Sequence, residues 1–279
     1  MEPITVYIIL ASVVGALLLL FLLYLFLIAP RRRRDLTRIF ASHSYAHRGL
    51  HGNGVPENSM AAFRCAVENG YGIEFDVQLT RDGVPVIFHD ATLKRMCGDG
   101  VTGGVVDYTY DELCAFRLDG TDEQIPTLRA LLQLVDGRVP LLMEVKREGD
   151  YKRTAALADK ETRDYRGLLM VESFHPFVIR YFKKARPTCV RGILSMNFSS
   201  DKSLRSPVYT FCRHLLFNFL MRPDFIAYHL PDGDALSLRL CRKMGATTFA
   251  WTVRTEEELR LAREQGFDGV IFEFIRPKG

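Results

Sequence analysis

The stretch GIEFDVQLTRDGVPVIFHD, residues Gly72 to Asp90, decides how the rest of the chain is interpreted. Its first part alternates as a β-strand does, with Glu74 and Asp76 on one face and apolar side chains on the other. The turn TRDG then predicts a hairpin to a second strand, Val84 to His89. Two carboxylates one strand period apart, followed by a His-Asp pair, indicate either a solvated sheet edge or a metal site.

The N-terminal segment Ile4 to Ile28 contains no charged residue. It is long enough to cross a hydrocarbon core of roughly 30 Å and therefore predicts a transmembrane helix. A cleaved signal peptide would carry positive charge before a shorter apolar core, whereas here Glu2 precedes the apolar run and the arginines follow it. The positive-inside bias predicts a single-pass protein of the cell membrane, with everything after Pro30 in the cytoplasm.

The charge of the chain is concentrated in one short segment. The 37 basic and 33 acidic residues give a net charge of +4, and residues 31–38 alone supply five Arg and one Asp, also +4. The remainder is balanced and lacks the basic face that nucleic-acid binding requires, so we expect no nucleic-acid partner. The arginine run is expected to contact anionic lipid headgroups.

Six cysteines are spread along the chain without tight pairing. Cys65 and Cys241 lie in amphipathic helical patterns, and Cys189 opens an apolar strand pattern. We therefore expect small buried side chains with free thiols, in agreement with a cytoplasmic location.

Short apolar strands alternate with helical patterns almost to the end of the chain. One helix is expected over Ser59 to Asn69, with Gly70 at its C-cap. This alternation predicts an α/β fold in which eight parallel strands close into a (β/α)8 TIM-type barrel. The expected domains are a transmembrane anchor over 1–30, a basic juxtamembrane linker over 31–42 and the barrel over 43–279. The expected strands are Ser44–His47, Gly72–Val77, Leu141–Val145, Leu168–Glu172, Cys189–Leu194, Phe225–Tyr228, Thr247–Thr252 and Gly269–Phe272.

Ionisable residues stand at the ends of the first three of these strands. His47 ends the first, the second holds Glu74 and Asp76, and the third ends with Glu144 and Lys146. The carboxyl ends of barrel strands share one rim, and such a carboxylate cluster needs a cation to neutralise it. Three carboxylates without cysteine or paired histidine favour Mg²⁺ or Ca²⁺ over zinc.

These residues fall in motifs that resemble a known family. AHRG (46–49), PENS (56–59), EFD (74–76), TRDGVPVIFHD (80–90), IPTL (125–128) and MEVK (143–146) follow the order and spacing of the glycerophosphodiester phosphodiesterase family. ESF (172–174), WTV (251–253) and DGVI (268–271) look like its later strand motifs, so the resemblance covers roughly residues 43–273. It implies a metal-dependent TIM-type barrel that hydrolyses glycerophosphodiesters to an alcohol and sn-glycerol 3-phosphate in phospholipid metabolism.

The resemblance also implies roles for individual residues. Asn58 is either a helix cap or a ligand contact, and which histidine is acid and which is base stays open. Arg254 and Glu273 depart from the family's pattern and put in doubt its contacts to the alcohol or glycerol end. Histidines outside the motifs, His51 among them, are expected to be structural or solvent-exposed. The implied metal ligands are Glu74, Asp76 and Glu144, the implied acid/base pair is His47 and His89, and the implied substrate contacts are Arg48, Glu57, Lys146 and Trp251.

Three alternatives stay open at this stage. The anchor favours a variant in which the enzyme is a lysophospholipase D that takes lysophospholipids from the bilayer. A membrane-tethered barrel without catalysis would tolerate loss of its histidines and carboxylates. A phosphoinositide phospholipase C or sphingomyelinase-D-like barrel shares the metal-and-histidine logic. The expected partners are therefore a glycerophosphodiester or lysophospholipid substrate and the bilayer.

Overall fold

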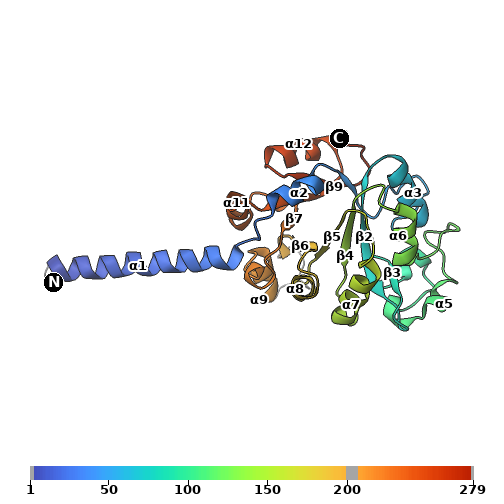
Figure 1. The fold of residues 1–279 in the computed structure, drawn as a ribbon, viewed down its shortest axis with the longest axis horizontal. Helices are drawn as coiled ribbons and strands as arrows, with labels where there is room; N and C mark the ends of the chain where they lie inside the picture. The colour runs from blue at the N-terminus through green and yellow to red at the C-terminus, as the bar shows by residue number, and fades with distance from the viewer. Residues whose placement is uncertain (1–2, 199–206, 278–279) are drawn as a thin grey trace.

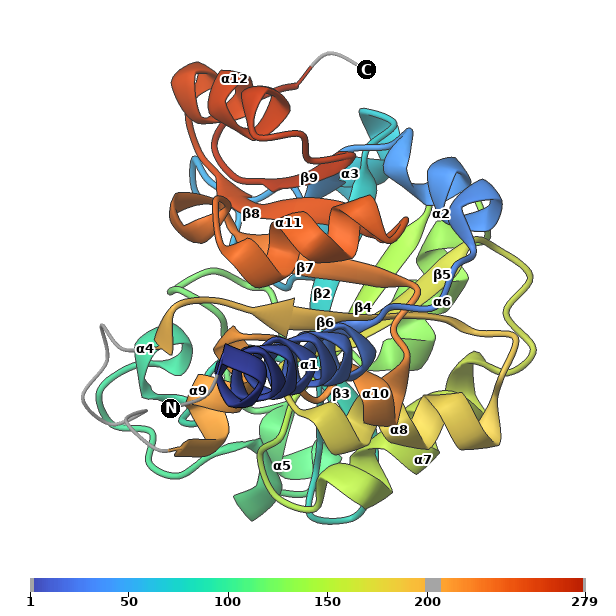
Figure 2. The ribbon, with the colours of Figure 1, turned by 90° about the vertical axis from the view of Figure 1, so that its left-hand side faces the viewer.

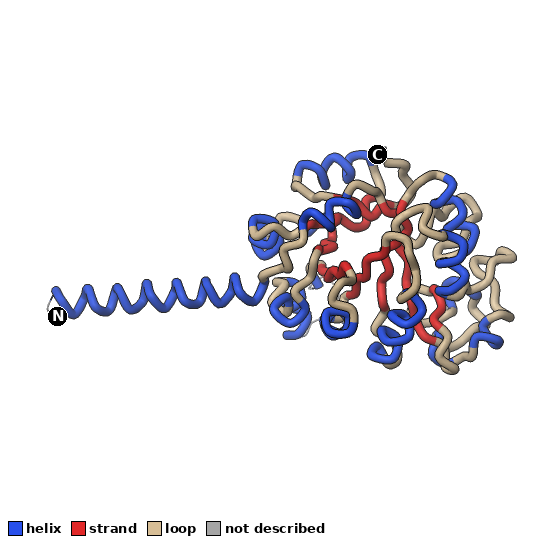
Figure 3. Tube along the Cα trace, viewed as in Figure 1, coloured by secondary structure: helices blue, strands red, loops and turns tan. Residues whose placement is uncertain are grey.

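The computed structural model describes residues 3–198 and 207–277. Eight parallel strands close into a barrel because the first strand pairs with both the second and the last. Figure 3 shows the strands as a ring with the helices outside it. The predicted closed TIM-type barrel is confirmed. In chain order the barrel strands are β1 (Tyr45–Ala46), β2 (Gly72–Leu79), β4 (Leu141–Val145), β5 (Leu169–Ser173), β6 (Val190–Ser195), β7 (Phe225–His229), β8 (Thr247–Val253) and β9 (Gly269–Phe272).

Helices cover the outer face of this barrel (Figure 1). The predicted helix over Ser59 to Asn69 is α3, which begins after Ser59 because the Ser59 hydroxyl accepts a hydrogen bond from the Ala62 amide. The longer helices on the barrel are α2 (Arg34–Ala41), α3 (Met60–Glu68), α6 (Leu128–Val135), α7 (Tyr151–Thr162), α8 (Pro176–Ala185), α9 (Pro207–Arg213), α11 (Leu236–Lys243) and α12 (Glu256–Glu264). The short ones are α4 (Lys94–Cys97), α5 (Tyr110–Leu113) and α10 (Asn218–Met221), with 3₁₀ turns at Val105–Asp107 and Leu230–Asp232.

The apolar core has a layer inside the barrel and a layer between strands and helices. Inside the barrel, the rings of Tyr45 and Phe225 both pack edge-on against Phe249, at centroid distances of 5.8 and 5.4 Å. Gly192 faces them, since a Cβ there would lie 2.2 Å from the Phe225 ring. Because these aromatic rings fill their part of the barrel interior, the polar inward-facing side chains lie nearer the carboxyl ends of the strands.

An additional strand, β3 (Pro85–Ile87), pairs antiparallel with the end of β2 and confirms the predicted hairpin. Gln78 on β2 holds the segment that follows β3, because its side-chain amide donates to the carbonyl oxygens of Phe88, His89 and Asp90. The hairpin thus carries the His-Asp pair back towards the inner face of β2.

The N-terminal apolar segment forms helix α1 (Pro3–Ile28), which extends away from the barrel (Figure 1). Its most apolar window has a mean hydropathy of 2.9 and no buried residue, so it is long and apolar enough to cross a membrane. Its last turn, by contrast, is fixed to the barrel. Ile28 is fully buried, and its carbonyl oxygen accepts a hydrogen bond of 2.8 Å from the buried Asn218 side chain.

The predicted linker, residues 31–42, contains helix α2. This helix packs on β8 and β9. The Thr37 and Thr247 hydroxyls are hydrogen-bonded at 2.6 Å, and Phe40 is buried in the apolar cluster of the barrel interior. Residues 34–41 are therefore packed as part of the barrel, at the amino-terminal end of its strands.

Three arginines of the basic run have acidic partners on the barrel. Arg31 and Arg33 each lie 3.8 Å from the buried Asp224 carboxylate, and Arg34 lies 3.0 Å from Asp268. The run expected to face lipid headgroups is thus largely engaged in contacts within the protein, which fix the chain between α1 and α2.

Candidate active site

Three carboxylates meet at the carboxyl end of the barrel strands. Glu74 and Asp76 lie on β2 and Glu144 on β4, each is buried, and one ligand atom from each lies within 4.8 Å of the others. Asp76 and Glu144 are direct partners in the parallel register. The structure therefore brings together the three side chains that the sequence singles out as metal ligands.

A fourth buried carboxyl group, Glu172, belongs to the same layer. It is the register partner of Glu144 on β5 and is 1% exposed. Sequence reasoning assigned it no role. The sequence pointed to Glu172 in one way only. Glu172 begins the ESF motif at the end of a predicted strand, two residues after the buried Met170 and on the same face of that strand.

Burial of four carboxyl groups perturbs their protonation. Desolvation raises the pKa of Glu74, Glu144 and Glu172, and the charges of their carboxylate neighbours add to this effect. Desolvation opposes ionisation of Asp76 as well, but Lys146 and its other cationic neighbours outweigh it and hold the pKa of Asp76 well below its ordinary value. The cluster therefore holds more acidic groups than its own cations neutralise.

The donor set fits a hard divalent cation. Lys146 Nζ lies 3.1 Å from Glu144 Oε1 and 3.3 Å from Asp76 Oδ1, and Arg48 Nε lies 3.6 Å from Asp76 Oδ2. These two cations leave the four carboxyl groups in excess, and only oxygen ligands are present, as Mg²⁺ and Ca²⁺ prefer. In the part of the chain that the structure describes, Glu74, Asp76 and Glu144 form the group of acidic residues that could hold a metal ion.

Arg48 connects the cluster to the loop after β1. Its backbone has a φ of 56°, and its amide donates to Glu74 Oε2 at 2.9 Å while its guanidinium donates to Glu57 Oε1 at 2.8 Å. Gly49 follows with a φ of 80°, and a Cβ there would lie 2.9 Å from Ala62 Cβ. This tight turn explains why glycine follows the His-Arg pair.

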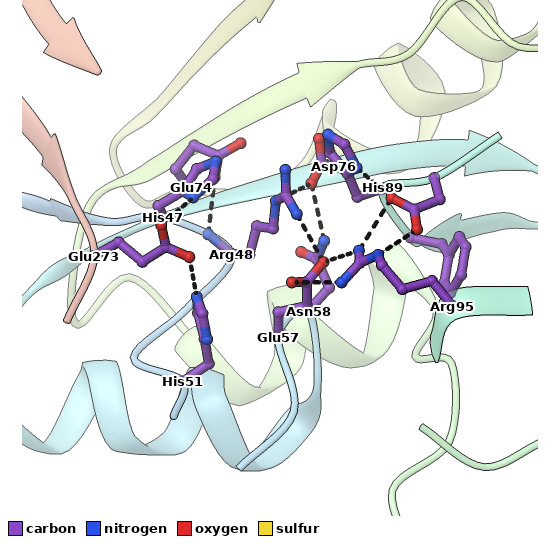
Figure 4. A network of polar contacts seen from close by, with 12 residues as sticks. His47, Arg48, His51, Glu57, Asn58, Glu74, Asp76, His89, Arg95 and Glu273 are labelled. Carbon is purple, nitrogen blue, oxygen red and sulfur yellow. Dashed lines mark hydrogen bonds and ion pairs between the residues drawn. The ribbon is translucent and has the colours of Figure 1, made fainter. Parts of the chain in front are cut away.

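His89 is held by its neighbour in sequence. Its Nδ1 is hydrogen-bonded to Asp90 Oδ1 at 2.7 Å, and Asp90 Oδ2 accepts from Arg95 Nε at 2.5 Å. Arg95 also donates to Glu57, so one chain of contacts joins the hairpin to the loop after β1 (Figure 4). Such a contact fixes the orientation of the imidazole and leaves its second nitrogen for proton transfer.

His47 and three residues to which the sequence analysis assigned no role in the site form a second group. His47 Nδ1 lies 3.9 Å from Glu273 Oε2, His51 Nε2 lies 3.0 Å from Glu273 Oε1, and Arg254 Nε donates to Glu273 at 2.7 Å (Figure 4). Burial lowers the pKa of His47. Both departures from the family pattern, Arg254 and Glu273, therefore lie behind His47, and His51 belongs to the site although no motif pointed to it.

Asn58 and Trp251 complete the site. Ser59 and not Asn58 caps α3, and the buried Asn58 side chain instead donates to Asp76 Oδ2 at 2.9 Å. Trp251, on β8, packs edge-on against Phe174 with ring centroids 5.5 Å apart. Its buried indole Nε1–H has no hydrogen-bond partner among the described residues. A polar group of a bound molecule would satisfy this donor.

The arrangement is suited to hydrolysis of an anionic ester. Carboxylates able to hold a divalent cation lie beside His47, which follows β1, and His89, which follows β3 (Figure 4). Lys146 and Arg48 supply fixed positive charge. A phosphodiester requires this combination of charge neutralisation and proton transfer.

Comparisons with known proteins agree with this chemistry. The model of the glycerophosphoryl diester phosphodiesterase family matches residues 47–276. A glycerophosphodiester phosphodiesterase of Caldanaerobacter subterraneus is 30% identical over 241 residues, which cover 81% of this chain and 91% of that protein. Human glycerophosphodiester phosphodiesterase 1 is 31% identical over 243 residues, covering 76% and 72%.

Solved structures are similar over the same region. An Oleispira antarctica phosphodiesterase in complex with the product sn-glycerol-3-phosphate has a TM-score of 0.69 at 26% identity, covering 83% of this chain and 92% of that one. A Silicibacter pomeroyi protein of 22% identity has a TM-score of 0.68, covering 85% and 93%, and supports the fold.

Proposed function

Because the chain belongs to the glycerophosphoryl diester phosphodiesterase family and is a phosphoric diester hydrolase, we propose that it acts at a membrane in phospholipid metabolism. Its reaction hydrolyses glycerophosphodiesters to an alcohol and sn-glycerol 3-phosphate. The observation that carries the proposal is the buried cluster of Glu74, Asp76 and Glu144 beside two histidines. The product bound to the similar Oleispira antarctica phosphodiesterase supports the choice of substrate class.

Glu74, Asp76 and Glu144 are the residues that would hold the divalent cation, Mg²⁺ or Ca²⁺. When bound, the cation supplies neutralising charge to the phosphoryl oxygens. Lys146 and Arg48 provide further positive charge beside the same carboxylates, so they favour the anionic substrate and the charge that develops during its hydrolysis.

His47 and His89 divide the proton transfers between them. One accepts the proton of the attacking hydroxyl or water, and the other donates a proton to the leaving alkoxide. Asp90 orients His89, whereas Glu273 lies beside His47. Glu57 keeps Arg48 and Arg95 together. Trp251 offers its indole N–H to the bound glycerol or alcohol part.

The N-terminal helix makes the enzyme a single-pass protein of the cell membrane, with the barrel on the cytoplasmic side. The apolar length of α1 and the basic residues after it support this arrangement. In domain terms, residues 1–30 are the anchor, 31–42 the basic juxtamembrane segment and 43–279 the catalytic barrel.

The test uses the full chain in phosphatidylcholine vesicles. We expect release of sn-glycerol 3-phosphate from glycerophosphocholine and glycerophosphoethanolamine with Mg²⁺ or Ca²⁺ and none with chelator. Glu74→Ala should abolish release, whereas Glu68→Ala, at an exposed glutamate of α3, should not. A folded protein that releases no product from either substrate, nor from lysophospholipids, would favour the membrane-tethered barrel without catalysis. Release of inositol phosphate from phosphatidylinositol would favour a phospholipase C.

A further inference from the structure

His229 ends β7 on the inner face of the barrel, although no motif of the sequence includes it. Along β7, Phe225 and Ala227 belong to the apolar cluster inside the barrel, whereas Ile226 and Tyr228 belong to the outer cluster. Because successive side chains of a strand point to opposite faces, His229 continues the inner set. Its side chain is 33% exposed, so a bound molecule can reach it.

This position lies across the barrel from the carboxylate cluster. Around the closed sheet, β7 is separated from β2 by β4, β5 and β6 on one side and by β1, β9 and β8 on the other. Figure 2 shows β7 on the near side of the barrel with β2 behind it. A substrate whose phosphoryl group lies at Glu74 and Asp76 would therefore present its far end to β7.

Asp232 fixes the imidazole of His229 in one orientation. Asp232 Oδ2 is hydrogen-bonded to His229 Nδ1 at 2.9 Å and also accepts from the Asn197 backbone amide at 2.9 Å. An ionised carboxylate only accepts hydrogen bonds, so Nδ1 carries the proton and Nε2 of the neutral ring is an acceptor. Among the described residues, Asp232 alone is hydrogen-bonded to this imidazole. Nε2 thus offers its lone pair to a donor on a bound molecule.

The imidazole also lies beside Trp251. The two residues are register partners on β7 and β8, and their ring centroids are 5.2 Å apart. Trp251 packs in turn against Phe174, which lines one cavity together with Glu144 and Lys146. Trp251 brings an N–H donor that has no partner among the described residues, and His229 brings an acceptor. A hydroxyl group, which both donates and accepts, is the chemistry that this wall fits.

We propose that His229, held by Asp232, accepts a hydrogen bond from the terminal hydroxyl of the substrate's glycerol and so determines specificity for a glycerol moiety. The inference rests on the proposed function and names a further substrate-binding residue of the same site. Along the glycerol chain the terminal hydroxyl is farthest from the phosphorus, as contact with the opposite wall requires. Ionised phosphoryl oxygens only accept hydrogen bonds and choline has no N–H or O–H, so the glycerol supplies the donors of glycerophosphocholine.

The test combines a change in the protein with a change in the substrate. His229→Phe keeps a ring against Trp251 and removes both nitrogens. The changed substrate is propane-1,2-diol phosphocholine, which is glycerophosphocholine without its terminal hydroxyl. Choline release is measured for all four combinations with the full chain in phosphatidylcholine vesicles. His214→Phe is the matched control, because His214 is exposed and does not line the cavity beside Phe174.

We expect His229→Phe to lower kcat/KM for glycerophosphocholine by about tenfold, the equivalent of one lost hydrogen bond. Loss of the terminal hydroxyl should cost the parent protein a similar factor, and His229→Phe should then cause no further loss with the shortened substrate. His229→Gln, whose amide oxygen also accepts, should recover part of the activity. His214→Phe should behave as the parent with both substrates.

Equal losses in His229→Phe with the full and the shortened substrate would limit His229 to a structural role and overturn the inference, as would a folded His229→Phe with unchanged kcat/KM. A loss with glycerophosphoethanolamine but not with glycerophosphocholine would assign the imidazole to the ammonium headgroup and also overturn it. Melting temperatures report folding, and His229→Ala replaces His229→Phe if the phenyl ring prevents it. A parent protein that releases no choline from glycerophosphocholine would contradict the proposed function itself.

Discussion

Asp76 and Glu144 are register partners on the neighbouring strands β2 and β4, and both carboxylates are buried. Two acidic side chains opposite each other in a sheet repel, and burial makes the repulsion stronger. Lys146, which contacts both, offsets only part of this charge. The close approach of these two carboxylates therefore fits a cation-binding site better than a purely structural role.

Replacing one carboxylate tests that conclusion directly. Glu144→Gln should lower kcat/KM by about a thousandfold or more, because a catalytic cation stabilises the transition state by several kcal/mol. We expect Mg²⁺ or Ca²⁺ to raise the melting temperature of the parent protein, and the same variant should lose this rise. Glu68→Gln, on the surface of α3, is the control, and a Glu144→Gln variant still stabilised by either ion would contradict the ligand role.

The stabilisation by the cation should depend on pH. The raised pKa values of Glu74 and Glu144 mean that the folded protein holds these protons more tightly than the unfolded chain. Their contribution to stability is therefore present at low pH and is lost as the pH rises through the raised values. A cation competes with the same protons, so the melting-temperature shift that it causes should grow from about pH 5 to about pH 8. Thermal melts with and without chelator measure this, and an equal shift at both pH values would argue against the coupling.

Asp90 should act through His89. Asp90→Asn should lower kcat by about 100-fold, since an imidazole of the wrong orientation or tautomer transfers protons poorly, and should change KM little. Steady-state kinetics at saturating cation separate the two parameters. Asp99→Asn serves as the control, because the Asp99 side chain is 94% exposed and, like Asp90, lies in the segment between β3 and β4. A loss confined to KM would assign Asp90 to substrate binding instead.

Glu273 should set the proton affinity of His47. Burial lowers the pKa of His47, and the Glu273 carboxylate works in the opposite direction, so removing its charge should lower that pKa further. In Glu273→Gln, the limb of the pH–rate profile that reports His47 should move to lower pH, with kcat/KM reduced by about tenfold. Glu273→Asp should recover part of the activity, whereas Glu264→Gln on the exposed face of α12 should behave as the parent. A pH–rate profile that is the same in Glu273→Gln and in the parent protein would limit Glu273 to a structural role.

Residues close in sequence were predictable because strand periodicity is local. The alternation around Glu74 and Asp76 places both on one face, and the TRDG turn returns His89 to the same strand. Glu172 was missed because its neighbourhood depends on the register between β4 and β5, which a single sequence does not carry. Glu273 was marked only as a departure from the family's pattern. Its place beside His47 was unpredictable for a similar reason, since only closure of the barrel places β9 beside β1.

Helix α2 escaped prediction for a different reason. The arginines around it dominate the composition of residues 31–38 and favour a solvated linker. Its packing rests on few side chains, chiefly Thr37 and Phe40, and on partners far along the chain such as Asp224. Helix–barrel contacts of this kind follow from tertiary structure and not from local pattern.

The junction between α1 and the barrel has a consequence for how substrates are found. Ile28 is buried and its carbonyl oxygen accepts a hydrogen bond from Asn218, while three of the arginines that follow are paired with Asp224 or Asp268. In the membrane arrangement proposed above, an enzyme mounted in this way could not swing on a tether, so its active site would stay at one height above the lipid surface. Encounters with substrates held at the membrane would then take place by lateral diffusion in two dimensions, and turnover would follow the number of substrate molecules per unit of membrane area.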